Sequence, residues 1–359
     1  MKAAVISLGS VSSLWTIEAM KKYFDSVTNI ELRDTEINLG GKELEVLYKG
    51  LPLPDFDCVY VKGSFRYLLL LRSITNALYQ KSYLPLSPEA FSIAHDKLLT
   101  HLILQHNKIP MPMTYLTSTV SSAKKILERV SYPIVMKFPH GTGGKGVMFA
   151  DSYASASSMF DALEALRQPF LIQEYVETGG IDIRAIVVGK EVIACMKRKA
   201  VIGEKRANIH AGGTGEDYIL SAQGQNMAIR TANCIGAEIC AVDMLEGTKG
   251  YVVIEANISP GLQGITQATK VNVADRIAHY LYEKTKVVME SNKRDTTTKI
   301  FEYLDIKKDS SSSQQIITNL DLRGERMLLP SIVTKLSKFR DKDEVVIKVG
   351  KEIIEIGKC

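Results

Sequence analysis

The stretch VIEAN at residues 253–257, read together with AVDM at residues 241–244, decides how this sequence folds. Both are apolar, strand-like runs that contain acids, and the glycines between them predict a turn that pairs the two strands. Side chains two apart on a strand share a face, so Glu255 and Asn257 point the same way and Asp243 reaches that face across the turn. Two carboxylates and an amide oxygen form the ligand set that Mg²⁺ (or Mn²⁺) prefers. The alternative is a solvated polar sheet face, but an unpaired charge within apolar strand sequence is costly.

A glycine-rich loop upstream of these strands forms a second candidate site. The loop GTGGKG at residues 141–146 follows Lys137, which ends an apolar run. Glycines let the backbone fold closely over phosphates, and a lysine at a strand end meets phosphate oxygens as a point charge. We therefore expect phosphate binding by Lys137, Gly143, Gly144 and Lys145. An ordinary hairpin is the alternative, because the loop matches neither a Walker A motif nor a dinucleotide fingerprint.

The third signal is QEYV at residues 173–176, at the end of an expected strand. Extended backbone there offers N–H and C=O groups to a flat purine, so Glu174, Tyr175 and Val176 are candidates for the base. Asp182, eight residues after Glu174, is a candidate for ribose hydroxyls. A strand exit with surface acids is the alternative.

A set of cationic and amide side chains forms the fourth signal. Arginine forks bind carboxylates and phosphates through two parallel hydrogen bonds. The glycines at the end of the loop at residues 203–215 suggest that the loop closes over a substrate. The candidate catalytic residues are Arg184, Arg198, Arg206 and Asn208, while His210 is a weaker candidate for a general base. A solvated basic loop is the alternative.

The apolar pattern predicts an α/β protein. In the first 90 residues, expected strands at 3–8 and 57–61 alternate with helices at 14–24 and 66–79, which predicts a parallel sheet covered by helices. One helix is expected from residue 88 to about 105. Three antiparallel pairs follow, at 134–137 with 147–150, at 183–188 with 191–197, and at 241–245 with 251–255, and they give this part α+β character. Helices are expected at 123–130, 222–235 and 273–284.

Bulk composition restricts the functional class. Apolar residues make up 45% of the 359 residues, and the net charge of +5 is mild, so nucleic acid is not the expected main partner. The five cysteines lack the spacing of metal ligands, which favours reduced thiols and a cytoplasmic location. The apolar run at residues 67–71 is far shorter than the roughly 20 residues that a membrane span needs, so no membrane association is expected.

The order of these motifs resembles the RimK-like branch of the ATP-grasp superfamily. The resemblance runs from about residue 3 to residue 284 and includes HDK at residues 95–97 and EANISPG at residues 255–261. It implies ATP held between two sheets, with Lys97 and Lys137 on the phosphates and Mg²⁺ on Asp243, Glu255 and Asn257. The arginine–serine–asparagine that is typical of the family is RAN here, at residues 206–208.

The resemblance also implies the domain organisation. We expect a pre-ATP-grasp domain at 1–90 and an ATP-grasp domain at 91–290, which divides into an ATP-binding subdomain at 91–176 and a metal and substrate subdomain at 177–290. The polar run DSSSSQQ at residues 309–315 indicates a linker over 291–315. The β-rich tail at 316–359 is similar to the AbrB-type swapped hairpin. Its nine basic and seven acidic residues are weak for DNA binding, which favours homo-oligomer formation or substrate docking.

The activity that this resemblance implies is that of an ADP-forming carboxylate–amine ligase. The expected reaction adds L-glutamate to a carboxylate of a coenzyme or a protein tail through an acyl-phosphate. One alternative is a ligase of the LysX/ArgX kind that acts on a carrier protein. Another, from a different class, is a DNA-binding or scaffolding protein that senses ATP.

Overall fold

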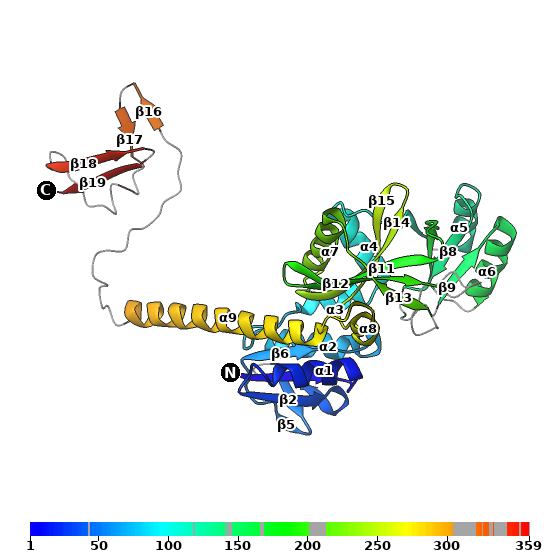
Figure 1. Ribbon diagram of the computed structural model, residues 1–359, viewed down its shortest axis with the longest axis horizontal. Helices are drawn as coiled ribbons and strands as arrows, with labels where there is room; N and C mark the ends of the chain where they lie inside the picture. The colour runs from blue at the N-terminus through cyan, green and yellow to red at the C-terminus, as the bar shows by residue number, and fades with distance from the viewer. Residues whose placement is uncertain are drawn as a thin grey trace. The chain divides into compact units, whose positions relative to one another are not determined.

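The chain divides into two compact units, Met1–Lys293 and Arg294–Cys359. The computed structural model describes residues 1–41, 44–117, 119–139, 141, 146–165, 169–200 and 213–303, and in the second unit 321–324, 326–329, 333, 343–351 and 353–358. Figure 1 shows the first unit as sheets covered by helices.

The N-terminal part has the expected parallel sheet. Its strands are β1 (Lys2–Ser7), β2 (Ser26–Glu31) and β6 (Cys58–Val61), in the order β2-β1-β6, and α1 (Val11–Met20) follows β1. Strands β1 and β6 are almost entirely buried, which explains their continuous apolar sequence. A small antiparallel sheet of β3 (Thr35–Asn38), β4 (Glu45–Tyr48) and β5 (Leu51–Pro52) was not predicted, because its strands are short and mostly polar or exposed.

The prediction of a single helix from residue 88 to 105 is wrong, because the segment forms two helices. After η2 (Phe65–Tyr67) and α2 (Leu68–Leu78), the chain forms two helices, α3 (Pro88–Ala94) and α4 (Lys97–His106). Asp96 interrupts the run in an extended conformation, and its Oδ1 accepts hydrogen bonds from the backbone N–H groups of Leu98 and Leu99, at 2.8 and 3.1 Å. The aspartate therefore begins α4 as its N-cap.

The next sheet has its own hydrophobic core. Its strands are β7 (Thr114–Leu116), β8 (Ile134–Lys137), β9 (Val147–Ala150) and β10 (Leu171–Glu174), in the order β7-β10-β8-β9. Helices α5 (Val120–Leu127) and α6 (Tyr153–Ala165) pack together on one face (Figure 1). Helix α6, which the sequence analysis did not predict, contributes Phe160, whose ring lies 4.6 Å from that of Phe170. The opposite face of the sheet is left for other contacts.

The largest sheet carries the strands that decided the fold. Its order is β13-β12-β11-β14-β15, with bounds β11 (Ile181–Val188), β12 (Glu191–Lys199), β13 (Thr214–Asp217), β14 (Ile239–Gly247) and β15 (Gly250–Asn257). All pairs are antiparallel, so the two predicted hairpins are confirmed. Helix α7 (Ala222–Cys234) packs against four of the five strands, and α8 (Gln263–Thr269) against β12 and β13.

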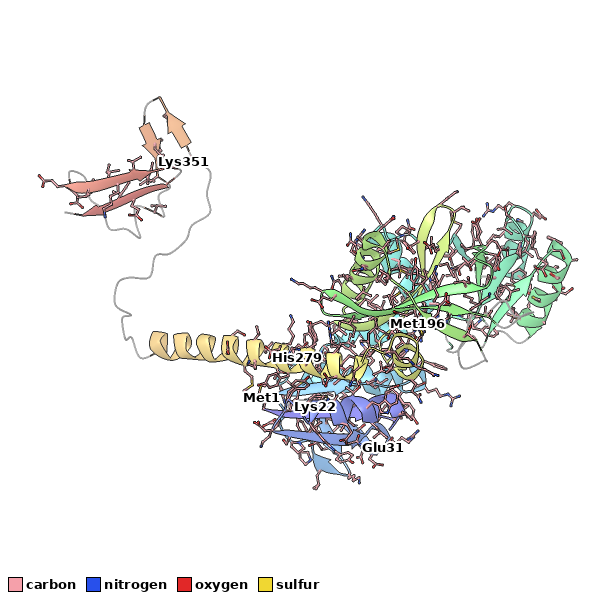
Figure 2. All side chains as sticks on the ribbon, in the orientation of Figure 1. Met1, Lys22, Glu31, Met196, His279 and Lys351 are labelled. Carbon is pink, nitrogen blue, oxygen red and sulfur yellow. The ribbon has the colours of Figure 1, made fainter. Side chains whose placement is uncertain are left out.

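The last predicted helix, which begins in the first unit, is longer than expected. Helix α9 runs over Val273–Tyr303, so residues 291–303, which were assigned to the linker, are helical. Its first turns pack against the end of α1: Lys22 Nζ lies 2.8 Å from Asp275 Oδ1, and the Tyr23 and His279 rings meet edge to face (Figure 2).

The second unit contains two antiparallel hairpins, β16 (Asp321–Arg323) with β17 (Arg326–Leu328) and β18 (Val345–Gly350) with β19 (Ile353–Lys358). The predicted strand alternation is therefore present, while the AbrB-like fold stays a prediction, as do the domain boundaries. Within the described ranges of both units, no helix is both long and apolar enough to cross a membrane.

Replacement of Asp96 with alanine tests the helix break. We expect the variant to lose about 1 kcal/mol of stability, because two N–H groups of α4 lose their acceptor. This corresponds to a fall of about 2–4 °C in the thermal unfolding midpoint. Asp96→Asn keeps a capping oxygen and should unfold close to the native midpoint. Equal midpoints for native protein and Asp96→Ala would contradict the capping role.

Candidate active site

The three predicted metal ligands lie on one face of the five-stranded sheet. Asp243 on β14 is directly opposite Glu255 on β15, and Asn257 follows Glu255 by two residues. Asp243 is buried, while the other two are half-buried. Neither Glu255 nor Asn257 uses its side chain in a hydrogen bond or ion pair within the described part of the chain. Their oxygens are therefore available to a ligand.

Asp243 belongs to a ladder of ion pairs that crosses three strands. Arg184 on β11 donates to both of its oxygens, from Nε at 2.8 Å and from a terminal nitrogen at 2.7 Å. Arg198 on β12 reaches Asp243 Oδ2 at 3.0 Å and donates two hydrogen bonds to Asp182, at 2.5 and 2.7 Å. Met196, labelled in Figure 2, lies opposite Arg184 in the β11–β12 pair. The ladder brings together four predicted site residues.

The pKa values of the two carboxylates in this ladder are shifted in opposite directions. Burial raises the pKa of Asp243, but Arg184 and Arg198 outweigh burial and lower that pKa to about 2. Asp182 is also buried, but among the arginines only Arg198 donates hydrogen bonds to it within the described residues. Burial therefore outweighs the arginine and raises the pKa of Asp182 to about 6. Asp243 is therefore a fixed anion, as a metal ligand requires. Asp182 was predicted to bind ribose; that role stays a prediction, since both its oxygens accept from Arg198 here.

The two predicted phosphate lysines lie near the predicted metal ligands, Lys137 at the end of β8 and Lys97 at the start of α4. Lys137 ends β8 close enough to Glu255 for the carboxylate to raise the lysine pKa, but burial and the neighbouring Lys97 together lower that pKa to about 8. Lys97 Nζ donates to the carbonyl of Gly141 at 2.9 Å. Lys97 and Gly141 line a cavity of about 10 Å³ with Glu255 and Asn257, which is room for one water-sized or ion-sized occupant.

A buried chain of hydrogen bonds fixes the ammonium of Lys137. Gln173 Oε1 accepts from Lys137 Nζ at 2.6 Å, and Gln173 Nε2 donates to Thr114 Oγ1 at 2.8 Å and to His101 Nε2 at 3.0 Å. His101 Nδ1 donates to the Lys97 carbonyl oxygen at 2.5 Å. Burial lowers the pKa of His101. The neutral tautomer with its proton on Nδ1 accepts from Gln173 Nε2 and donates to the Lys97 carbonyl, as both contacts require.

The residues predicted for the purine lie at the end of β10. Glu174, Tyr175 and Val176 are half-buried. The backbone N–H of Glu174 donates to the Met113 carbonyl at 2.9 Å, and the Tyr175 ring meets Phe149 edge to face at 6.0 Å. The extended strand end that was expected is present, and the contact with a base stays a prediction.

Several candidates lie outside the described residues. They are Gly143, Gly144 and Lys145 of the glycine loop, and Arg206 and Asn208, together with His210, of the later loop. Their roles stay predictions.

The sequence analysis missed the residues that position Lys137. Gln173 is a polar side chain at a buried position of β10, directly after the apolar residues Leu171 and Ile172. This pattern could have indicated a buried hydrogen-bond network. His101 and Thr114 gave no such signal, because each lies next to Gln173 only through folding.

The donor set fits a hard divalent cation. Glu255 and Asn257 line a cavity of ionic size, and Asp243 lies opposite Glu255 in the strand pair. Within the described residues Asp243 Oδ1 accepts one hydrogen bond, so a lone pair remains for a metal. Lys97 at the start of α4 and Lys137 at the end of β8 suit the phosphates of a nucleotide that such a cation would accompany.

Comparison with known proteins gives the family. Residues 94–281 match the RimK-like ATP-grasp domain. A probable alpha-L-glutamate ligase of Legionella pneumophila (strain Corby) is 34% identical over 265 residues, which cover 72% of this chain and 86% of that protein. One from Thioalkalivibrio sulfidiphilus is 33% identical over 291 residues, with 80% and 97% covered.

Solved structures share the fold. The ATP-grasp ligase PsnB, complexed with a variant of its minimal precursor, Mg and ADP, aligns with a TM-score of 0.61 at 17% identity over 79% of this chain and 98% of its own. A RimK domain protein from Sphaerobacter thermophilus gives 0.60 at 18% identity over 78% and 99%.

Replacement of His101 with leucine tests the positioning chain. We expect the KM for ATP to rise about five- to tenfold, because one Gln173 N–H loses its acceptor at a cost of about 1 kcal/mol and Lys137 is held less firmly. Steady-state kinetics measures the effect, and the exposed Leu102→Ala on the same helix is the control. An unchanged KM for ATP in His101→Leu would argue against the chain.

The lowered pKa of Lys137 predicts a pH dependence of nucleotide binding. Below pH 8 the ammonium is charged in the free protein, and above pH 8 binding has to recharge it. The affinity for ATP without magnesium should therefore fall as pH rises, by up to about tenfold per unit. Lys137→Arg, whose side chain stays charged, should give a flatter profile in calorimetric titrations. A flat native profile between pH 8 and 10 would refute the assignment.

Proposed function

Because the chain belongs to the RimK-like family of ATP-grasp ligases, we propose that it joins L-glutamate to a carboxylate acceptor with ATP as the energy source. The observation that carries the proposal is the convergence of Glu255 and Asn257 with Lys97 on one ion-sized cavity. The names of the curated relatives, probable alpha-L-glutamate ligases, support glutamate as the amino acid. The acceptor that we propose is a coenzyme or a protein tail with a terminal carboxylate.

The reaction has two steps. An acceptor carboxylate oxygen attacks the γ-phosphorus of ATP, the bond from that phosphorus to the ADP oxygen breaks, and an acyl-phosphate forms. The amine of glutamate then attacks the acyl carbon, an amide bond forms, phosphate leaves, and the amine loses a proton to solvent. Catalysis by positioning and charge stabilisation is sufficient for both steps.

The chain's own residues supply the charge stabilisation. Lys97 and Lys137 approach the phosphates from the β8 side, and the His101–Gln173 chain keeps the second ammonium in place. Asp243, Glu255 and Asn257 would hold Mg²⁺, which would neutralise charge on the phosphoryl oxygens. Arg184 and Arg198 lie along the same sheet face and hold Asp243 in its charged form. From there, we propose, their guanidinium groups stabilise the oxyanion of the second step.

The other candidate functions differ in what they require. A ligase of the LysX/ArgX kind uses a carrier protein as acceptor and fails to turn over with small carboxylates. A DNA-binding or scaffolding protein releases no ADP with any amino acid. Our proposal also includes a cytoplasmic location and self-association through the tail.

Replacement of Glu255 with alanine tests the proposal. ADP release with ATP, Mg²⁺, L-glutamate and cell extract as the source of acceptor should fall at least about 10²-fold, because a divalent cation at phosphoryl oxygens contributes several kcal/mol. Glu191→Ala, which removes an exposed carboxylate from the same sheet, should leave turnover unchanged. Mass spectrometry of the extract identifies the acceptor by the added glutamate residues. Full turnover in Glu255→Ala would overturn the proposal.

A further inference from the structure

Lys62 is a buried lysine to which the proposed reaction assigns no role. It follows directly after β6, and its backbone N–H donates to the Ile6 carbonyl of β1 at 2.8 Å. The residue is 3% exposed. Lysine is among the residues that folded proteins bury least often without a partner.

No counter-charge accompanies this ammonium within the described residues. Lys62 Nζ is buried and has no hydrogen-bond partner or ion pair there, and it lies 5.4 Å from the centre of the Tyr60 ring. The Tyr60 hydroxyl is likewise buried without a hydrogen-bond partner. Burial lowers the pKa of Lys62 to about 8, so the group is still largely charged at neutral pH. Two buried polar groups without partners, two residues apart in the chain, indicate room for a ligand or solvent molecule.

The position of Lys62 in the sheet favours a ligand. In the strand order β2-β1-β6, the chain leaves β1 to form β2 on one side and later forms β6 on the other side. The direction of the strand order therefore reverses between β1 and β6. Open parallel sheets bind ligands outside the carboxyl ends of the two strands that flank such a point. Lys62 lies at the carboxyl end of one of these two strands.

A backbone contact joins this position to the candidate active site. The N–H of Gly63 donates to Ser259 Oγ at 3.0 Å, and Ser259 follows Asn257 by two residues. Phe65, three residues after Lys62, lines the same cavity as Glu255 and Asn257. Residues that follow Lys62 closely in the chain therefore contact the cavity or the segment after Asn257.

We propose that Lys62 recognises a carboxylate of the amino-acid substrate, and this rests on the proposed ligase function. The proposal requires that rotation of its four-carbon stem away from the Tyr60 ring carries the ammonium to the cavity. Among the anions of the reaction, the phosphates are assigned to Lys97 and Lys137, and Arg184 is bound to Asp243. The reacting carboxylate of the acceptor has to lie at the γ-phosphate, beside these lysines, so the carboxylates of glutamate are the anions that still need a counter-charge.

A purely structural role makes a different prediction. If the lysine only fills space over the Tyr60 ring, methionine of similar length replaces it with no change in kinetics. If it binds substrate, the same change removes a buried unpaired charge, which does not weaken the fold, and removes the recognition of substrate.

Lys62→Met should raise the KM for L-glutamate about ten- to a hundredfold, the effect of losing a charged hydrogen bond, while the KM for ATP stays within twofold. Its thermal midpoint should equal or exceed that of the native protein. Lys49→Met is the matched control, because Lys49 also lies over a tyrosine ring, that of Tyr48, but is exposed. An unchanged KM for glutamate overturns the proposal, and a raised KM for ATP alone assigns Lys62 to phosphate instead and also overturns it.

A binding measurement separates this proposal from the proposed function. Glutarate carries two carboxylates but no amine, so it binds without turnover. It should raise the thermal midpoint of the native protein and leave that of Lys62→Met unchanged. If the native protein releases no ADP with glutamate, the proposed ligase function fails, and the glutarate shift alone decides whether Lys62 binds carboxylates. An equal shift in both proteins, or none in the native one, overturns the role of Lys62.

Discussion

The ladder of ion pairs across β12, β11 and β14 is the interaction on which the candidate site depends. Arg198 is shared between Asp182 and Asp243, and Arg184 binds Asp243 through two hydrogen bonds. Because the partners come from adjacent strands, the ladder is possible only in one register of the sheet, and a slip by one residue would turn each side chain to the other face. The same register places Glu255 opposite Asp243. Fold specificity and the arrangement of the candidate metal ligands thus have a common origin.

The sequence predicted the parts of this site that depend on local periodicity. Glu255 and Asn257 share a face because they are two apart on a strand, and the hairpin from Asp243 follows from two apolar runs around glycines. It also predicted the N-terminal parallel sheet, where buried strands are continuously apolar. It did not predict the pairing of Arg184 with Asp243, because the two residues are 59 apart and meet only through strand order.

The break between α3 and α4 shows why some local structure escapes sequence reasoning. The apolar periodicity of residues 88–105 is that of one helix, yet Asp96 leaves the helical conformation and caps a second one. The break brings the Lys97 backbone N–H within 3.0 Å of the Pro139 carbonyl and directs its ammonium to Gly141. A tertiary contact at the candidate phosphate site therefore prevails over the helical propensity of the segment.

The four-stranded sheet with α5 and α6 has a hydrophobic cluster of its own, which shares no described buried residue with the larger cluster. A body with its own hydrophobic core can tilt as a rigid unit without breaking apolar contacts in the other cluster. The free energy needed to admit a nucleotide would then come mainly from breaking polar contacts along its inner face. Such a separation allows rigid-body motion of the sheet, and where that motion opens the site, the rate of product release would depend on how often the sheet moves.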